Sequence, residues 1–228
     1  MEIEVPHAWP DDEAEALRIQ DALRPLVDTV GPGPRAPRTV AGVDVAYGAD
    51  RPDGSTPVAA AVVVLDTVTL RPVATATAVG STTFPYRPGL FAFRELPTVI
   101  TALRSLHHTP DLLLCDGQGL AHPRRFGLAC HLGVLTGLPT AGVAKNAFVG
   151  TFSGLGTERG EWAPLLDGTE VVGRALRTRS GVKPVFVSVG HAIDLATASR
   201  HVLALAPGYR LPETTRLADR LCRQVLRG

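Results

Sequence analysis

Hydrophobic residues alternate with small or polar residues along 39–47, which is the two-residue period of a half-buried strand. Two further apolar runs, 58–65 and 73–79, follow after short turns. Strands joined by short connections usually pair as antiparallel neighbours. The core is therefore predicted to begin with a three-stranded antiparallel meander.

The hydrophobic pattern changes to helical spacing after Gly89. One apolar stripe contains Leu96, Val99, Ile100, Leu103 and Leu106. Pro97 is tolerated only in the first turn of a helix, so we expect this helix to begin close to Glu95. Apolar strands over 112–115 and 140–144 then alternate with a helix around 126–136.

The remaining elements complete an alternating order of strands and helices. Segments 162–177 and 185–189 have the pattern of further strands, which we expect at the edge of the sheet. Helices are predicted over 10–26, after Asp194, and from Pro212 to the end. This order predicts an α/β, ribonuclease H-like fold with a mixed central sheet, in which three antiparallel strands precede parallel ones and helices cover both faces.

We expect one domain spanning residues 1–228. It would consist of an N-terminal helix and linker (1–38), a catalytic core (39–205) and a C-terminal helix (206–228). The sequence is 45% hydrophobic and 20% charged, and no apolar run approaches the length of a membrane helix. The N-terminus is acidic where a secretory signal would be basic, so we expect a cytoplasmic protein without a membrane partner.

Net charge and cysteine content exclude few classes of function. The net charge of +1 neither supports nor excludes a nucleic-acid partner, because a groove can be basic on a neutral protein. Cys115, Cys130 and Cys222 are odd in number and lack metal-ligand spacing, so we expect buried free thiols.

Three carboxylates are candidates for chemistry. Asp44 lies in the middle of an apolar strand, where an unpaired carboxylate costs several kcal/mol; a pair with a core arginine or backbone donors is the alternative. Glu95 lies near a helix start, where glutamates are usually solvated. Asp116 ends a buried strand and precedes Gly117 and Gly119, which permit either a ligand cradle or a tight turn.

If these carboxylates converge, their like charges require a cation. Oxygen ligands with open positions favour Mg²⁺, with Mn²⁺ as its substitute, and such metals support phosphodiester hydrolysis. Lys145 follows the strand beside that of Asp116 and could neutralise a phosphate, or could be an ordinary surface lysine. His191 follows an apolar strand and could reach the same edge, although a core or capping histidine fits the pattern equally well.

The loop 84–89 places Tyr86 between two prolines. A rigid exposed tyrosine is suited to wedging into a base stack, whereas a proline-rich turn that packs its tyrosine on the core is the alternative. His122 and Arg124 lie in a loop that could contact sugar or phosphate, or could simply carry solvated charge at a helix start.

Several segments together resemble the endonuclease V family. They read AGVDVAY, FPYRPGLFAFRE, LLLCDGQGLAHPRRFGLACHLG, GVAKN and VKPVFVSVGHAIDLATA, in that order along the chain. The resemblance implies a Mg²⁺-dependent endonuclease that flips hypoxanthine out of DNA and cuts the second phosphodiester bond on its 3′ side. The products would carry 3′-hydroxyl and 5′-phosphate ends.

The resemblance also implies residue roles. Asp44, Glu95 and Asp116 would hold the metal, His191 would complete the catalytic set and Lys145 would contact phosphate near the cut. Tyr86 would fill the gap left by the flipped base, and backbone from Gly117 to His122 would line the base pocket. The expected nucleic-acid contacts are Pro85, Tyr86, Arg87, Pro88, Gly89, Gly117, Gly119, His122, Arg124 and Lys145.

Other functions remain compatible with the sequence. One is a module that binds inosine without cutting it, and another is a nuclease of the same fold that acts on inosine in RNA or on mismatched or branched DNA. Inosine-containing DNA is the expected partner, and the protein is expected to be monomeric.

Overall fold

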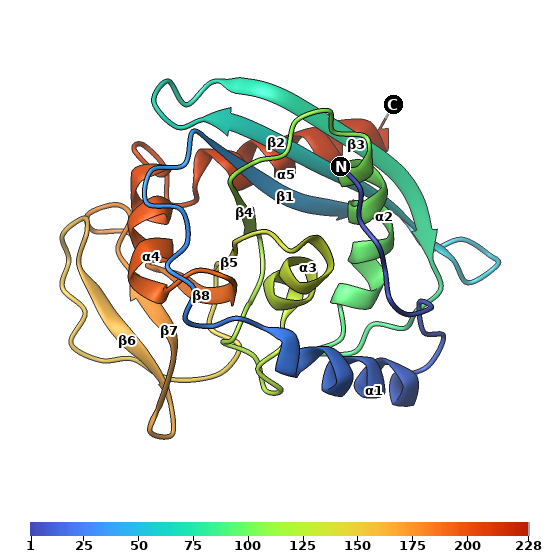
Figure 1. Ribbon diagram of the computed structural model, residues 1–228, viewed down its shortest axis with the longest axis horizontal. Coiled ribbons are helices and arrows are strands. Elements are labelled where there is room, and N and C mark those ends of the chain that lie inside the picture. The colour runs from blue at the N-terminus through green and yellow to red at the C-terminus, as the bar shows by residue number, and fades with distance from the viewer. Residues whose placement is uncertain (228) are drawn as a thin grey trace.

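The computed structural model describes residues 1–227 and contains one eight-stranded sheet in the order β3-β2-β1-β4-β5-β8-β7-β6 (Figure 1). The strands are β1 (Thr39–Tyr47), β2 (Thr56–Asp66), β3 (Pro72–Thr82), β4 (Leu112–Cys115), β5 (Thr140–Ala144), β6 (Trp162–Asp167), β7 (Glu170–Leu176) and β8 (Val185–His191). The strands β1, β2 and β3 pair antiparallel, whereas β4 and β5 continue the sheet parallel to β1. The predicted ribonuclease H-like arrangement is therefore confirmed.

The strand β8 joins β7 and β6 to the rest of the sheet. It pairs antiparallel with β5 on one side and with β7 on the other, so it lies inside the sheet, and β6 forms the edge on this side. Residues 185–190 are all buried, as a strand covered on both faces requires. The strands β8, β7 and β6 thus extend the sheet beyond β5, so the predicted addition at the sheet edge is present, with β8 as its innermost strand.

Helices cover both faces of the sheet (Figure 1). They are α1 (Glu13–Leu23), α2 (Ala92–Arg104), α3 (Leu128–Thr136), α4 (Leu195–Ala204) and α5 (Glu213–Arg227). The helices α2 and α3 pack on one face, and α4 and α5 pack on the other. The final residue of the predicted C-terminal segment, Gly228, lies outside the described residues.

The helix α2 starts earlier than the sequence predicted. It begins at Ala92, so Pro97 lies inside the helix and Glu95 lies in its first turn. The proline removes one backbone donor, but the apolar stripe, which includes Leu96 and Ile100, buries the helix against the sheet. Tertiary packing therefore outweighs the local cost of the proline.

The helix α5 approaches β1 closely because of one glycine. A Cβ atom at Gly42 would lie 2.1 Å from the carbonyl carbon of Thr214, which is closer than any side chain permits. Gly42 and Asp44 project from the same face of β1, since they are two residues apart. The glycine therefore lets α5 lie directly over the face that carries Asp44.

Two other expectations concern membranes and thiols. None of the helices within residues 1–227 combines the length and apolar character that crossing a membrane would need. Cys115, Cys130 and Cys222 are all buried and free, which confirms their assignment as thiols that form no disulfide.

A buried histidine links the N-terminal segment to the core. His131 of α3 is fully buried among the rings of Trp9, Phe93 and Phe126, and its Nε2 lies 3.2 Å from Nε2 of His7. Burial lowers the pKa of His131 to about 3, and the nearby His7 adds to this effect. His131 is therefore neutral wherever the protein is folded near neutral pH.

The buried state of His131 makes stability depend on pH. In the unfolded chain its pKa is about 6.5, so below this pH the unfolded state binds a proton that the folded state does not. The free energy of unfolding is thus expected to fall by about 2 kcal/mol more in wild type than in His131→Gln between pH 7.5 and pH 5. Urea unfolding at both pH values measures this difference, and equal losses in the two proteins would contradict it.

Candidate functional site

Two acidic residues meet at the carboxyl edge of the parallel strands. Val43 of β1 pairs with Cys115 of β4, so the next residues, Asp44 and Asp116, lie level with one another. The pKa of Asp44 is raised to about 8, chiefly by burial and in addition by the charge of Asp116. The sheet register therefore brings together two carboxylates that are 72 positions apart in sequence.

A third carboxylate reaches this edge from α2. Burial raises the pKa of Glu95 to about 7, with the charge of Asp116 contributing in the same direction. The hydroxyl of Tyr47, at the end of β1, donates a hydrogen bond to Oε1 of Glu95 at 3.1 Å, which favours the ionised form. The charge of Asp116 therefore acts on both Asp44 and Glu95.

Lys145 joins this group directly. It follows β5, and its Nζ lies 2.6 Å from Oδ2 of Asp116. Burial alone would lower the pKa of Lys145, but the hydrogen bond and the charge of Asp116 outweigh it and raise the pKa. In this structure the lysine therefore neutralises part of the negative charge at the site.

His191 does not reach the acidic residues, contrary to the prediction. Because β8 is antiparallel to β5, His191 pairs with Thr140 at the start of β5, whereas Lys145 follows the end of that strand. The two ends of β5 are about 13 Å apart. Nδ1 of His191 instead accepts a hydrogen bond from the backbone N–H of Asp28 at 3.2 Å, next to the linker.

A fourth carboxylate, missed from the sequence, comes from α5. Asp219 raises the pKa of both Asp44 and Lys145 through its charge, so it lies on their side of the helix. The exposed face of α5 is otherwise basic, and Arg223 donates to Oδ1 of Asp219 at 2.9 Å. A lone aspartate beside the buried Ala218 and Cys222 was the signal in the sequence that could have identified it.

The donor set suits a hard cation, although these carboxylates currently have other partners. Within residues 1–227, no three His, Cys, Asp or Glu side chains are arranged so that together they could hold a metal ion. Oδ1 of Asp44 accepts from the backbone N–H of Val45 at 2.9 Å, while Glu95 and Asp116 bind Tyr47 and Lys145. All the acidic groups offer oxygen, which is the donor that Mg²⁺ and Mn²⁺ prefer.

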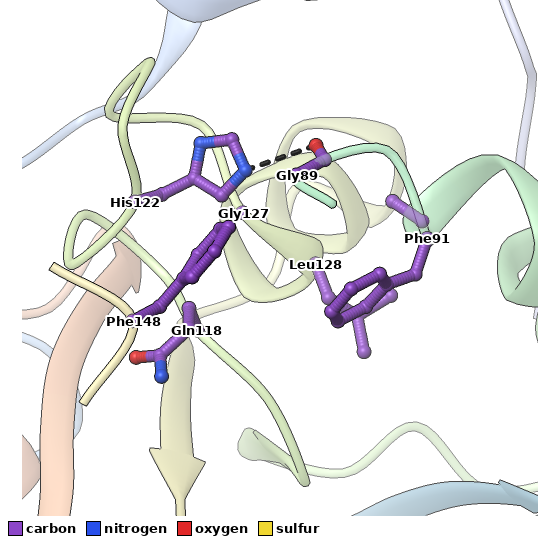
Figure 2. Close-up of a pocket in the computed structure, with 8 residues that line it drawn as sticks. Gly89, Phe91, Gln118, His122, Gly127, Leu128 and Phe148 are labelled. Atoms are coloured by element: carbon purple, nitrogen blue, oxygen red, sulfur yellow. Dashed lines mark hydrogen bonds between the residues drawn. The ribbon is translucent and has the colours of Figure 1, made fainter. Parts of the chain in front are cut away.

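A narrow hollow lies beside the acidic group, between the 84–89 loop and the loop that follows β4. His122 and Phe148 lie on one side of it, and Phe91 and Leu128 lie on the other (Figure 2). The hollow has a volume of about 20 Å³, which is room for about one water molecule. A base can enter it only if these side chains move apart.

His122 and Gly119 form hydrogen bonds within the protein. Nε2 of His122 bonds to the carbonyl of Gly89 at 2.9 Å, and its Nδ1 accepts from the backbone N–H of Arg124 at 3.1 Å. Gly119 donates its N–H to Ser188, and a Cβ there would lie 2.0 Å from the carbonyl oxygen of Val189. In this structure the polar groups of His122 and Gly119 bond within the protein, so a contact with nucleic acid would have to replace these bonds.

The 84–89 loop is exposed, as a wedge would need. Tyr86 is 67% exposed and its ring stacks on Phe91, with 5.9 Å between the ring centroids and 15° between their planes. The alternative, a tyrosine packed on the core, is thereby excluded. Gly89 ends the loop with a φ of +85°, a conformation that favours glycine and turns the chain into α2.

The helix α1 holds the two loops in place. Gln20 is 1% exposed, and its Nε2 donates to the carbonyls of Gly89 at 3.0 Å and Phe126 at 3.3 Å. Two predicted contact residues form ion pairs with this region: Arg87 with Glu13 at 3.2 Å and Arg124 with Asp21 at 2.6 Å. The helix predicted over 10–26 thus connects the 84–89 loop, called the tyrosine loop below, to the wall of the hollow.

The sheet order and the acidic edge define a ribonuclease H-like protein, and sequence comparison refines this class. The family model of Endonuclease V matches residues 22–220. The chain therefore belongs to the endonuclease V family, a family of nucleases. It is 59% identical to Endonuclease V of Streptomyces avermitilis over 227 residues, which cover 99% of this chain and 97% of that protein.

Solved structures agree with this assignment. The crystal structure of the Streptomyces avermitilis protein has a TM-score of 0.91 and 60% identity, and the match covers 98% of this chain and 96% of that chain. Endonuclease V of Ciona intestinalis, solved in complex with a 24mer DNA containing an inosine followed by a ribo-adenosine, has a TM-score of 0.81 and 27% identity. That match covers 94% of this chain and 97% of that chain.

The bonding of His122 predicts a structural cost when it is replaced. His122→Phe keeps an aromatic ring but removes the bonds to Gly89 and Arg124, so the free energy of unfolding should fall by about 1–3 kcal/mol. Urea unfolding at pH 7.5 measures this, with the exposed His107→Phe as the matched control. Equal stability of the two variants would contradict the assigned role.

Proposed function

We propose that this protein is a DNA repair endonuclease that recognises hypoxanthine and hydrolyses the second phosphodiester bond on the 3′ side of the lesion. The grouping of Asp44, Glu95, Asp116 and Lys145 at one sheet edge carries this proposal, together with the family match over residues 22–220. The Ciona intestinalis relative, bound to inosine-containing DNA, supports the choice of substrate. Inosine in RNA is the competing substrate.

Asp44, Glu95 and Asp116 would hold Mg²⁺, and Mn²⁺ would substitute for it. Burial and the charge of Asp116 raise the pKa of Asp44 and of Glu95, so a cation beside these carboxylates would relieve the energetic cost of their charge. When bound, a divalent cation stabilises charge on the phosphate and lowers the pKa of water. Asp219 would strengthen the attraction of the site for the cation from α5.

The other residues of the site would position the scissile phosphate. Lys145 would exchange its contact with Asp116 for the phosphate, since a metal ion would then neutralise the carboxylate. Hydrolysis would leave a 3′-hydroxyl and a 5′-phosphate. Arg210 supports Lys145, because its guanidinium donates to the backbone carbonyl of that residue.

The exposed tyrosine loop and the hollow would recognise the lesion. Tyr86 would enter the gap left by the flipped base, with Pro85, Arg87 and Pro88 shaping the loop. The base would enter the hollow after Phe148 moves, because the present volume is too small for a purine. Phe148 is 39% exposed, so its ring has room to turn outward.

We also propose that the protein works as a cytoplasmic monomer with one domain. The N-terminal helix α1 supports the loops of the site, and α5 supplies Asp219 to it. Both terminal segments would therefore be needed for activity.

The metal-binding carboxylates can be tested by substitution. Asp44→Asn and Asp116→Asn should each lower kcat/KM by about 100-fold or more, because each removes a charge that would hold the cation. The measurement is nicking of a labelled DNA strand that contains one inosine, with Mg²⁺ present. The exposed Asp11→Asn is the matched control and should cut like wild type.

The same assay addresses the competing functions. Equal cutting by wild type and both variants would exclude the metal site, and tight binding without cutting would indicate a recognition module. An RNA strand with one inosine and DNA strands with a mismatch or a flap complete the comparison. The proposal requires the inosine-containing DNA to be cut fastest.

A further inference from the structure

A second, larger hollow adjoins the one described above. It is lined by residues from the end of β1, the start of β2, the tyrosine loop and α2, and its volume is about 340 Å³. This volume falls in the range of small-ligand sites, whereas the neighbouring hollow has about 20 Å³. The function proposed above assigns nothing to this space.

One aromatic ring separates the two hollows. Phe91 lines both of them, and Figure 2 shows its ring on the side of the smaller hollow opposite Phe148. Tyr86 stacks on Phe91 and lines only the larger hollow. Two neighbouring nucleotides could therefore lie on the two sides of Phe91.

The opposite wall of the larger hollow is polar and leads to the acidic site. Oγ1 of Thr56 donates to Oδ1 of Asp50 at 2.6 Å and lies 3.5 Å from a guanidinium nitrogen of Arg94. The guanidinium of Arg94 lies 5.2 Å from the ring centre of Tyr47, whose hydroxyl binds Glu95. Arg94 provides a positive charge for a phosphate close to the carboxylates.

The proposed distance between the lesion and the cut fits the arrangement of the two hollows. A cut at the second phosphodiester bond on the 3′ side leaves one nucleotide between the lesion and the scissile bond. That nucleotide must lie between the smaller hollow, which would hold the flipped base, and Glu95. The larger hollow lies in this place, since Phe91 and Glu95 both line it. The aromatic side chains offer stacking without reading base edges, so any of the bases would fit.

We propose that the larger hollow binds the nucleotide immediately 3′ to the lesion, with its base stacked on Phe91 and Tyr86 and its phosphate directed toward Arg94. This inference rests on the proposed function and extends it. Phe91 and Arg94 then set the distance between the recognised base and the cut.

The experiment combines altered strands with altered proteins. One DNA strand carries inosine followed by an ordinary nucleotide, a second has an abasic residue immediately 3′ to inosine, and a third has it immediately 5′. For wild type, the 3′ abasic residue should lower kcat/KM about tenfold through lost stacking, and the 5′ abasic residue should have a smaller effect. Equal effects of the two abasic positions would overturn the inference.

Phe91→Leu tests the stacking partner itself. It should lower kcat/KM on the intact strand, and the 3′ abasic residue should then cost clearly less than in wild type, because the ring on which the base stacks is gone. Phe148→Leu is the matched control in the smaller hollow, and the 3′ abasic residue should cost this variant the full tenfold. An undiminished abasic cost in Phe91→Leu would contradict the assignment.

The outcomes separate this inference from the function on which it rests. A wild-type protein that does not nick the intact inosine strand would overturn both. Normal nicking of the intact strand, with no difference between the two abasic positions, would overturn only the assignment of the larger hollow. The wild-type comparison needs no variant, so poor folding of Phe91→Leu would not prevent a decision.

Discussion

Burial of negative charge at the carboxyl edge of the parallel strands is the constraint on which the site depends. Asp44 and Asp116 are brought level by the register of β1 and β4, and burial, together with the charge of Asp116, raises the pKa of Asp44 to about 8. Folding alone would not favour this arrangement, because like charges in a buried position destabilise one another. Such a cost at one place, with perturbed pKa values, is typical of a functional site.

The surroundings of the carboxylates reduce this cost in several ways. Lys145 forms an ion pair with Asp116, and Tyr47 donates a hydrogen bond to Glu95. These contacts occupy carboxylate oxygens, so a bound cation would have to replace them. The sheet register and α2 therefore fix the positions of the carboxylates, whereas their side-chain contacts would change when a cation binds.

The side of the site that we propose to bind the lesion depends on a different set of interactions. Gln20 and His122 hold the carbonyl of Gly89, so the tyrosine loop and the wall of the base hollow form one bonded unit. The helix α1 contributes none of the carboxylates of the site, yet its Gln20 holds the end of the loop at Gly89. The tyrosine loop and the acidic edge thus have separate supports, and the larger hollow, which both Phe91 and Glu95 line, lies between them.

Residue patterns determined most of the elements and part of the site. The alternation along 39–47 placed Asp44 within a strand, and the apolar run before Asp116 placed that residue at a strand end. Strand and helix periodicities are local properties, so the sequence alone reveals them. The family resemblance, which rests on ordered motifs, likewise required no coordinates.

Only the tertiary structure decided which distant residues meet. The antiparallel direction of β8 placed His191 at the opposite edge from Asp116, and the close contact of α5 with Gly42 brought Asp219 toward Asp44. Strand direction depends on pairing partners, and helix docking depends on the shape of the surface beneath, so neither follows from local periodicity. The sequence by itself therefore determined the elements and the acidic strand positions, whereas packing selected the residues that complete the site.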